Sequence, residues 1–177
     1  GVQLGRVIER TRAREALRRS EARFRTIFEK SAIGIQVSDA EVYILDTNPA
    51  LQEMLGFSAQ ELQRLALTEI THPQDLETNW ALLQSLLRGE RSSYQTQTRY
   101  IHKNGGMIWT ELTVSSVTDG QGKTQFVVML VRDISELKRK SMELDEVQRK
   151  LVESAEKERI SLARELHDGP LQDLYGA

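Results

Sequence analysis

The stretch from Ile134 to Leu166 constrains the fold of this chain most, because it contains neither proline nor glycine. Leu137, Leu144 and Leu151 lie seven residues apart within it, and Val147 occupies an intervening position. A seven-residue apolar repeat is typical of a helix that buries a narrow seam against another helix. We therefore predict a long helix that forms a parallel coiled coil in a homodimer. An amphipathic helix packed on its own domain is the alternative.

The repeat changes register after Leu151. The next strong apolar position is Leu162, eleven residues further on, with Ala155 between them and Leu166 following. Four residues inserted into a heptad repeat form a stutter, which locally unwinds the supercoil. We expect this stutter to act as a switching point along the helix.

Residues 2–30 also predict a helix, since they contain no proline and no glycine after Gly5. Apolar residues occur at mostly helical spacings in this stretch: Leu4, Ile8, Leu17, Phe24, Ile27 and Phe28. The first twenty-five residues hold eight arginines and three glutamates, which we interpret as a solvated helix face with glutamate partners one turn away. A basic arm for nucleic acid is the alternative, but aromatic residues do not alternate with these arginines.

Between these helices the apolar period changes to that of strands and short helices, so the predicted fold class is α+β. Asn48 and Ser58 are expected helix caps, Glu61 completes a capping box with Ser58, and Gly56 is expected to end the first short helix. The predicted strands are 33–37, 42–45, 93–103, 107–118 and 124–133, and the predicted helices include 49–55 and 74–88. Glycine-containing turns at 104–106 and 119–122 predict hairpins between the last three strands.

Several classes of site are excluded or disfavoured by composition. The chain has no cysteine, which rules out disulfides, thiolate catalysis and cysteine-bound metals, and we expect no metal site. The net charge of -2 favours neither nucleic acid nor an acidic membrane as a partner. The longest apolar run, Phe126 to Val131, is too short to cross a bilayer, and no signal peptide is visible. A cytoplasmic location is expected.

The order of these elements resembles a PAS domain over residues 24–135. The resemblance rests on residues 23–29 (RFRTIFE), 48–57 (NPALQEMLGF), 72–75 (HPQD), 105–109 (GGMIW) and 133–135 (DIS). It implies a five-stranded antiparallel sheet with short helices, flanked by the two long helices. The chain departs from the family at 39–41, where Asp-Ala-Glu replaces the usual aspartate-glycine turn.

The PAS resemblance also implies a signal relay. Asp133 and Ser135 stand where the family's aspartate-isoleucine-threonine signature joins the last strand to the output helix. Their side chains can hydrogen-bond the backbone at this corner. A change there is expected to pass to the seam residues of the helix, namely Leu137, Leu144, Leu151 and Leu162.

Residues 158–172 (ERISLARELHDGPLQ) closely resemble the phosphoacceptor box of a histidine-kinase family, H-D-x-x-x-Q. This resemblance implies that His167 accepts phosphate, that Asp168 takes a proton from the ring's other nitrogen, and that Gln172 orients a water during dephosphorylation. ATP and magnesium are then expected in a separate ATP-binding domain, and a response regulator is the expected partner. Pro170 predicts a kink or weak point beside His167.

The predicted organisation has four parts. Residues 1–23 are a linker helix, in which 3–10 resemble the last helix of a GAF domain and suggest a sensory domain upstream. Residues 24–135 form the PAS domain, 136–157 the signalling helix, and 158–177 the start of a dimerisation and phosphotransfer domain. The rest of that domain and the ATP-binding domain are absent, so this segment is not expected to phosphorylate itself alone.

The sequence does not identify a PAS ligand. Flavin-type PAS photosensors use a cysteine, and haem-binding relatives place a histidine on the helix expected at 74–88, which has none. His72 and His102 are interpreted as structural or surface residues. Four aromatic residues could line a pocket or pack in the core: Trp80, Tyr94, Tyr100 and Trp109. Two other functions stay open, a PAS dimerisation or ligand-binding module and a PAS-linked enzyme of nucleotide second-messenger metabolism.

Overall fold

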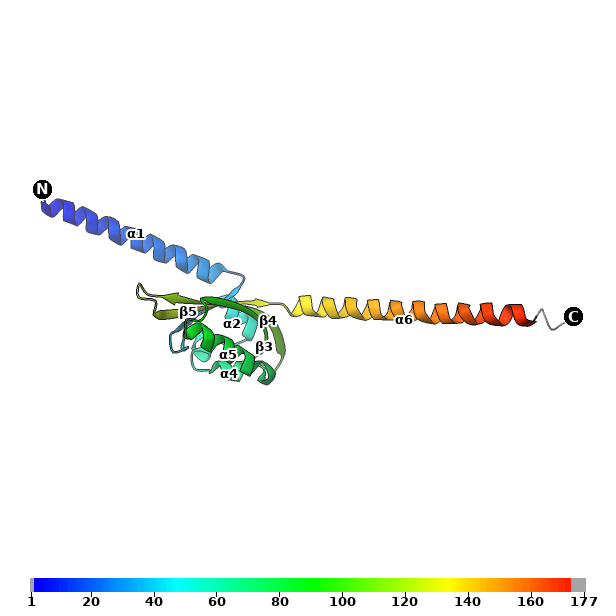
Figure 1. The fold of residues 1–177 in the computed structure, drawn as a ribbon. Coiled ribbons are helices and arrows are strands. Elements are labelled where there is room, and N and C mark those ends of the chain that lie inside the picture. Colours follow the sequence, from blue (N-terminus) through cyan, green and yellow to red (C-terminus); the bar gives the residue numbers. More distant parts are fainter. Residues whose placement is uncertain (1, 173–177) are drawn as a thin grey trace. The chain divides into compact units, whose positions relative to one another are not determined.

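The computed structural model describes residues 2–172, with side chains through His167, and Figure 1 shows its ribbon. Two long helices flank the fold, α1 (Val2–Lys30) and α6 (Ser135–Gln172). The strands are β1 (Gly34–Asp39), β2 (Ile44–Thr47), β3 (Ser93–Ile101), β4 (Met107–Thr118) and β5 (Thr124–Asp133). The short helices are α2 (Pro49–Leu55), α3 (Ala59–Leu62), α4 (Leu67–Ile70), the 3₁₀ turn Pro73–Asp75 and α5 (Leu76–Leu87). Residues up to Ile134 form one compact unit, and α6 belongs to another.

The five strands form one antiparallel sheet in the order β2-β1-β5-β4-β3. Along β4 and β5 alternate residues are buried, which is the period-two pattern of a sheet with one covered face. The helices between β2 and β3 cover that face (Figure 1). Fully buried side chains from both layers form the core, among them Leu51, Leu55, Leu62, Leu86, Val114, Val127 and Val131. The predicted α+β fold is confirmed.

Asn48 joins three elements of the unit that ends at Ile134. Its Oδ1 accepts hydrogen bonds from the backbone N–H of Leu51 at 3.1 Å, as the N-cap of α2, and of Ile35 in β1 at 2.8 Å. Its Nδ2 donates to the carbonyl oxygens of Phe28 in α1 and Ile33. Asn48 is fully buried, and these bonds satisfy its amide, so the cap also fixes the end of α1 against the sheet.

The predicted caps are confirmed. Gly56 ends α2 in the left-handed conformation, and Ser58 and Glu61 form the capping box of α3. The predicted bounds of the second strand, 42–45, are wrong by two residues at each end, because β2 runs from Ile44 to Thr47 and continues through Asp46. The chain turns before it with Val42 at a φ of 71°, and Asp39 Oδ1 accepts the N–H groups of Glu41 and Tyr43. Without a glycine, side-chain hydrogen bonds hold this turn.

Other boundaries also differ from the prediction. The helix expected at 74–88 begins as the 3₁₀ turn Pro73–Asp75 and continues as α5 from Leu76 to Leu87. Helix α4 was not predicted, and its four residues show too little periodicity to identify it. Strand β3 ends at Ile101 rather than at residue 103, because His102 turns back and accepts the N–H of Asn104. The bounds of β4 and β5 are as predicted.

Both long helices expose their apolar residues. Helix α1 buries only Phe28 among its described residues, and Phe24 stacks on that ring at 5.7 Å between centroids. Helix α6 leaves Leu137, Leu144 and Leu151 about three-fifths exposed (62%, 64% and 64%). Ion pairs four residues apart link Glu136 to Lys140, Arg139 to Glu143 and Glu146 to Lys150.

Among the described helices, none is both long and apolar enough to traverse a lipid bilayer.

Candidate functional sites

A cavity of ≈ 490 Å³ lies between α4, α5 and the covered face of the sheet. The residues that line it are Leu67, Thr68, Thr71, Leu76, Glu77, Asn79, Trp80, Leu83, Tyr94, Tyr100, Leu112 and Met129. Trp80, Tyr94 and Tyr100 were predicted to line a pocket or to pack in the core, and all three line this cavity. Trp109, the fourth aromatic residue in that prediction, does not.

The cavity wall is mostly apolar and close to uncharged. The hydroxyl of the buried Tyr100 donates to Met129 Sδ at 3.5 Å. Burial raises the pKa of Tyr94 to about 12 and also raises the pKa of Tyr100, so both phenols are neutral at physiological pH. Of the described residues that line the cavity, Glu77 alone carries a charge. This chemistry suits a small, uncharged and largely apolar molecule.

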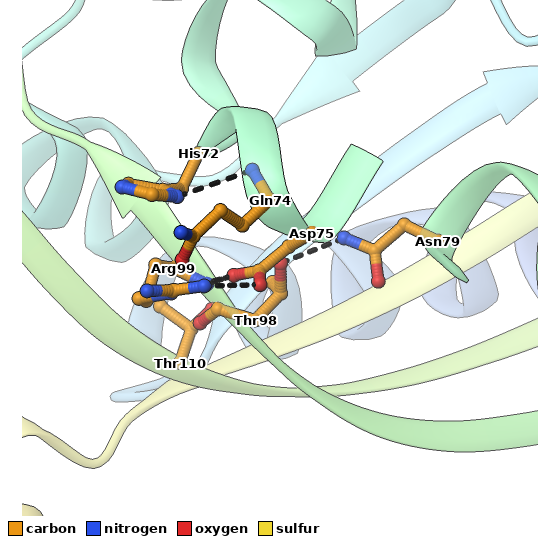
Figure 2. Close-up of polar contacts among 7 residues, drawn as sticks. All are labelled: His72, Gln74, Asp75, Asn79, Thr98, Arg99 and Thr110. Carbon is orange, nitrogen blue, oxygen red and sulfur yellow. Dashed lines mark hydrogen bonds and ion pairs between the residues drawn. The ribbon is translucent and has the colours of Figure 1, made fainter. Parts of the chain in front are cut away.

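Polar contacts hold α5 against β3 beside the cavity. Asn79 Nδ2 donates to Thr98 Oγ1 at 2.7 Å, and Thr110 Oγ1 donates to the Thr98 carbonyl at 3.0 Å. Thr98 and Thr110 are fully buried, so each bond satisfies a group shielded from water. Figure 2 shows Asn79 reaching Thr98 from α5.

The turn before α5 is bound to the edge of the sheet by an ion pair. Asp75 accepts from the Arg99 guanidinium at 2.6 Å and 2.9 Å and from the Arg99 backbone N–H at 2.8 Å (Figure 2). Both side chains are 18% exposed. The Arg99 hydrogen bonds hold the pKa of Asp75 below its ordinary value of 3.8, and burial opposes them only partly. The pair therefore stays ionised and fixes the start of the cavity wall.

Both histidines of the unit that ends at Ile134 have local structural roles, in agreement with their interpretation from sequence. His72 Nδ1 accepts the N–H of Gln74 at 3.3 Å and caps the turn into α5. His102 Nδ1 accepts the N–H of Asn104 in the β3–β4 hairpin. Among the side chains of residues 2–167, no group of three or more histidines or carboxylates is arranged to hold a metal ion.

The residues predicted to carry chemistry belong to α6 and not to the unit with the cavity. His167 is exposed near the end of this helix. Asp168 and Gln172 are helical, but their side chains lie outside the described part of the chain. The helix continues through Pro170 to Gln172, so this proline does not end it, and the kink beside His167 stays a prediction.

The predicted relay corner spans the junction of the two units. Asp133 is the last residue of β5, and Ser135 is the first residue of α6. Between them Ile134 is 3% exposed, and its N–H donates to the Trp109 carbonyl at 2.8 Å. The roles predicted for Asp133, Ser135 and the seam leucines remain predictions. Sequence analysis missed the Asp75–Arg99 pair, for which the HPQD motif at 72–75 was the only local signal.

Comparison with known proteins finds a family model described as the PAS fold, which matches residues 44–131. The probable diguanylate cyclase DgcE of Escherichia coli is 36% identical over 152 residues, covering 86% of this chain and 13% of that protein. The sensor histidine kinase TmoS of Ectopseudomonas mendocina is 33% identical over 138 residues, covering 78% of this chain and 14% of that protein. The chain thus spans about one seventh of the length of either relative.

Solved structures show the same fold. A PAS domain of a Colwellia psychrerythraea protein matches with a TM-score of 0.59 at 19% identity, covering 65% of this chain and 97% of that one. A domain of a sensory box sensor histidine kinase/response regulator from Geobacter sulfurreducens matches with a TM-score of 0.55 at 23% identity. This match covers 66% of this chain and 96% of that chain. In both matches almost the whole solved domain is aligned with part of this chain.

Proposed function

The chain contains a PAS domain, and on that premise we propose that it is the sensory and relay segment of a cytoplasmic sensor histidine kinase. The PAS domain receives the stimulus, and α6 carries the change as one strand of a dimeric coiled coil. His167 accepts the γ-phosphate of ATP and passes it to an aspartate of a response regulator.

One observation carries this proposal. The H-D-x-x-x-Q box at 167–172 lies on the same helix that begins directly after the last strand of the PAS domain. A change at the end of β5 therefore needs no further domain to reach His167. The sensor histidine kinase TmoS, similar over most of this chain, supports the same proposal.

The proposed chemistry follows from the three residues of the box. In its neutral form the imidazole of His167 offers a nucleophilic lone pair, and a phosphoryl group can be brought in line with it because the helix exposes it. Asp168 accepts the proton of the other ring nitrogen and fixes the tautomer. Gln172 lies one turn beyond Asp168, where it orients water for dephosphorylation of the regulator.

The relay uses helix geometry. Asp133 and Ser135 fix the corner between β5 and α6, and two copies of α6 meet along the seam of Leu137, Leu144 and Leu151. The stutter before Leu162 lets the register of the two helices change between signalling states.

Phosphorylation tests this function directly. The chain is incubated with radiolabelled ATP, magnesium and the separately produced ATP-binding domain of its full-length protein. We expect acid-labile, alkali-stable label on the wild type and on His102→Gln, and none on His167→Gln. An unlabelled wild type, or label that persists in His167→Gln, would remove the basis of the proposal.

A PAS segment of an enzyme of cyclic-dinucleotide metabolism is the second candidate. The similarity to a probable diguanylate cyclase over 86% of this chain favours it. The full-length protein would then convert GTP to a cyclic dinucleotide, and His167→Gln would leave that rate unchanged. Incubating the full-length protein with GTP and magnesium, and separating the nucleotides by chromatography, distinguishes the two candidates.

A ligand-binding module without its own chemistry is a third candidate, which the apolar cavity favours. In that case, ligand binding changes the association of the chain with a partner and no phosphate is transferred. The absence of label on His167, together with retention of a small apolar molecule after purification, would favour this candidate.

A further inference from the structure

The edge of the sheet at Arg99 is covered by the turn that leads into α5. Strand β3 is an edge strand, so its outward N–H and C=O groups have no neighbouring strand. At Arg99 the N–H donates to Asp75 Oδ2 and the carbonyl accepts the N–H of His72 at 2.8 Å. The turn His72–Asp75 thus takes the place of a strand at Arg99, next to the isolated antiparallel bridge between Thr71 and Tyr100. Because α5 begins at the next residue, Leu76, a shift of its first turn acts directly on Arg99.

The Arg99 side chain continues these contacts onto β4. Its guanidinium carbon lies 5.2 Å from the centroid of the Trp109 ring, and Arg99 and Trp109 face each other in the β3–β4 ladder. A guanidinium over an indole is attracted by the electron-rich face of the ring. Asp75 holds the same guanidinium by two parallel hydrogen bonds (Figure 2), so Arg99 cannot follow Asp75 without changing its contact with Trp109.

Trp109 in turn holds the last residue before α6. The Trp109 carbonyl accepts the N–H of Ile134 at 2.8 Å, and the Ile134 side chain is buried. A continuous set of contacts therefore runs from the cavity wall at Leu76, through Asp75, Arg99 and Trp109, to Ile134.

We propose that Arg99 is a positioning residue of the signal relay, which couples the start of α5 to the backbone at Ile134. A molecule that enters or leaves the cavity displaces the first turn of α5, on which Leu76, Glu77 and Asn79 line the cavity. Asp75 moves with that turn, Arg99 changes its position on Trp109, and the hydrogen bond to Ile134 changes in strength. The signalling meaning rests on the proposed function, whereas the mechanical coupling does not.

Arginine suits this position for a chemical reason. Its planar fork binds a carboxylate in two places and stacks on an aromatic ring at the same time, whereas the lysine ammonium is a single point of charge. Lys103 provides an internal comparison within the same domain. It pairs with Glu61 at 2.6 Å and lies 5.7 Å from the Phe57 centroid, but these contacts do not lead to Trp109 or Ile134.

Amide hydrogen exchange of the whole chain, followed by NMR, tests the coupling. The measured quantity is the ratio of the exchange rate of the Ile134 N–H to that of the core amides of β4 and β5. Taking this ratio corrects for any change in global stability. We expect Asp75→Asn and Arg99→Gln each to raise this ratio about tenfold, the effect of losing one charge-assisted hydrogen bond. Arg99→Lys is expected to give a smaller increase and serves if Arg99→Gln does not fold.

The control and the double variant decide the outcome. Lys103→Gln, which breaks an ion pair and a cation–π contact elsewhere, should leave the ratio unchanged. Because the contacts act in series, Asp75→Asn combined with Arg99→Gln should raise the ratio no further than Arg99→Gln alone. An unchanged ratio in Asp75→Asn, or effects that add in the double variant, would overturn the coupling. No phosphate enters this measurement, so its failure is separate from failure of the kinase function.

Discussion

Asp75 shows how much of the sensory unit depends on a single carboxylate. It lies at the junction of the 72–75 turn and α5, and all described hydrogen bonds of its carboxylate are to Arg99, 24 residues further along the chain. Its lowered pKa means that folding stabilises the ionised form of the Asp75 carboxyl group relative to the neutral form. The pair therefore contributes stability at neutral pH.

The pH dependence of stability follows from the direction of this shift. Asp75→Asn should lower the free energy of unfolding by roughly 2 kcal/mol at pH 7. Since the folded pKa is depressed, the contribution is complete above the ordinary value of 3.8 and is lost as the pH falls through the folded pKa. Urea unfolding at several pH values should show the two proteins converging in acid. As a control, Glu41→Gln, which removes an exposed carboxylate from another turn, should lower the free energy of unfolding little at any pH. If Asp75→Asn remained less stable than the wild type in acid, the loss of stability would not come from the ionised Asp75–Arg99 pair.

At the scale of elements, the end of α2 lies close to the β3–β4 hairpin. Gly56 has a φ of +77°, and a Cβ added there would lie 2.5 Å from His102 Nε2. Gly89 has nearly the same φ of +73°, but nothing lies within 4 Å of its added Cβ. The two glycines thus separate the cost of a left-handed backbone from the cost of a steric clash.

Alanine at these two positions should give clearly different stabilities. Gly89→Ala should cost roughly 1 kcal/mol, the backbone cost alone. Gly56→Ala should cost about 1–3 kcal/mol more, because the His102 ring must shift, together with the β3–β4 hairpin that holds it. Thermal denaturation of both variants measures the difference in their stabilities. His102→Ala and the double variant Gly56→Ala/His102→Ala show how much of the cost of Gly56→Ala comes from the His102 ring. Equal destabilisation by the two glycine variants would mean that the hairpin adjusts without cost.

Elements whose signals are local were predicted well from sequence. As caps, Asn48, Gly56 and Ser58 use hydrogen bonds to residues three or four positions away, and α2 and α3 have the predicted caps. The start of β2 was missed because the turn before it uses Asp39 and a left-handed Val42 in place of glycine. The Asp75–Arg99 pair was not predicted, because it depends on where the start of α5 meets an edge strand, 24 residues further along the chain. A pocket was one of two alternatives for Trp80, Tyr94 and Tyr100, and only the packing of α4 and α5 on the sheet decides between pocket and core.

At the scale of the whole molecule, the proposed signalling depends on two copies of α6. In one chain the seam residue Leu144 is 64% exposed, and Met142, which lies off the seam, is 60% exposed. Exposure therefore does not distinguish the two residues, whereas the seven-residue repeat includes only Leu144. A dimer would bury the repeat and leave Met142 in solvent.

Aspartate at either position tests the dimer. Leu144→Asp should weaken self-association at least about tenfold, equivalent to about 1.4 kcal/mol, because a charge would be buried in the seam. Met142→Asp adds the same charge at a neighbouring site on the same helix and should leave association unchanged. Sedimentation equilibrium over a range of protein concentrations measures both. Equal association of the two variants and the wild type would place the helix contact elsewhere.

The positions of the two tryptophans give this protein an optical property of its own. Trp80 lines the cavity and is 54% exposed, whereas Trp109 lies against the Arg99 guanidinium. With Trp109 replaced by phenylalanine, Trp80 is the single tryptophan, and its emission would report occupancy of the cavity. With Trp80 replaced instead, emission from Trp109 would report the state of the Asp75–Arg99 ion pair. Stopped-flow traces of the two variants would then give the order of the two events without any attached dye.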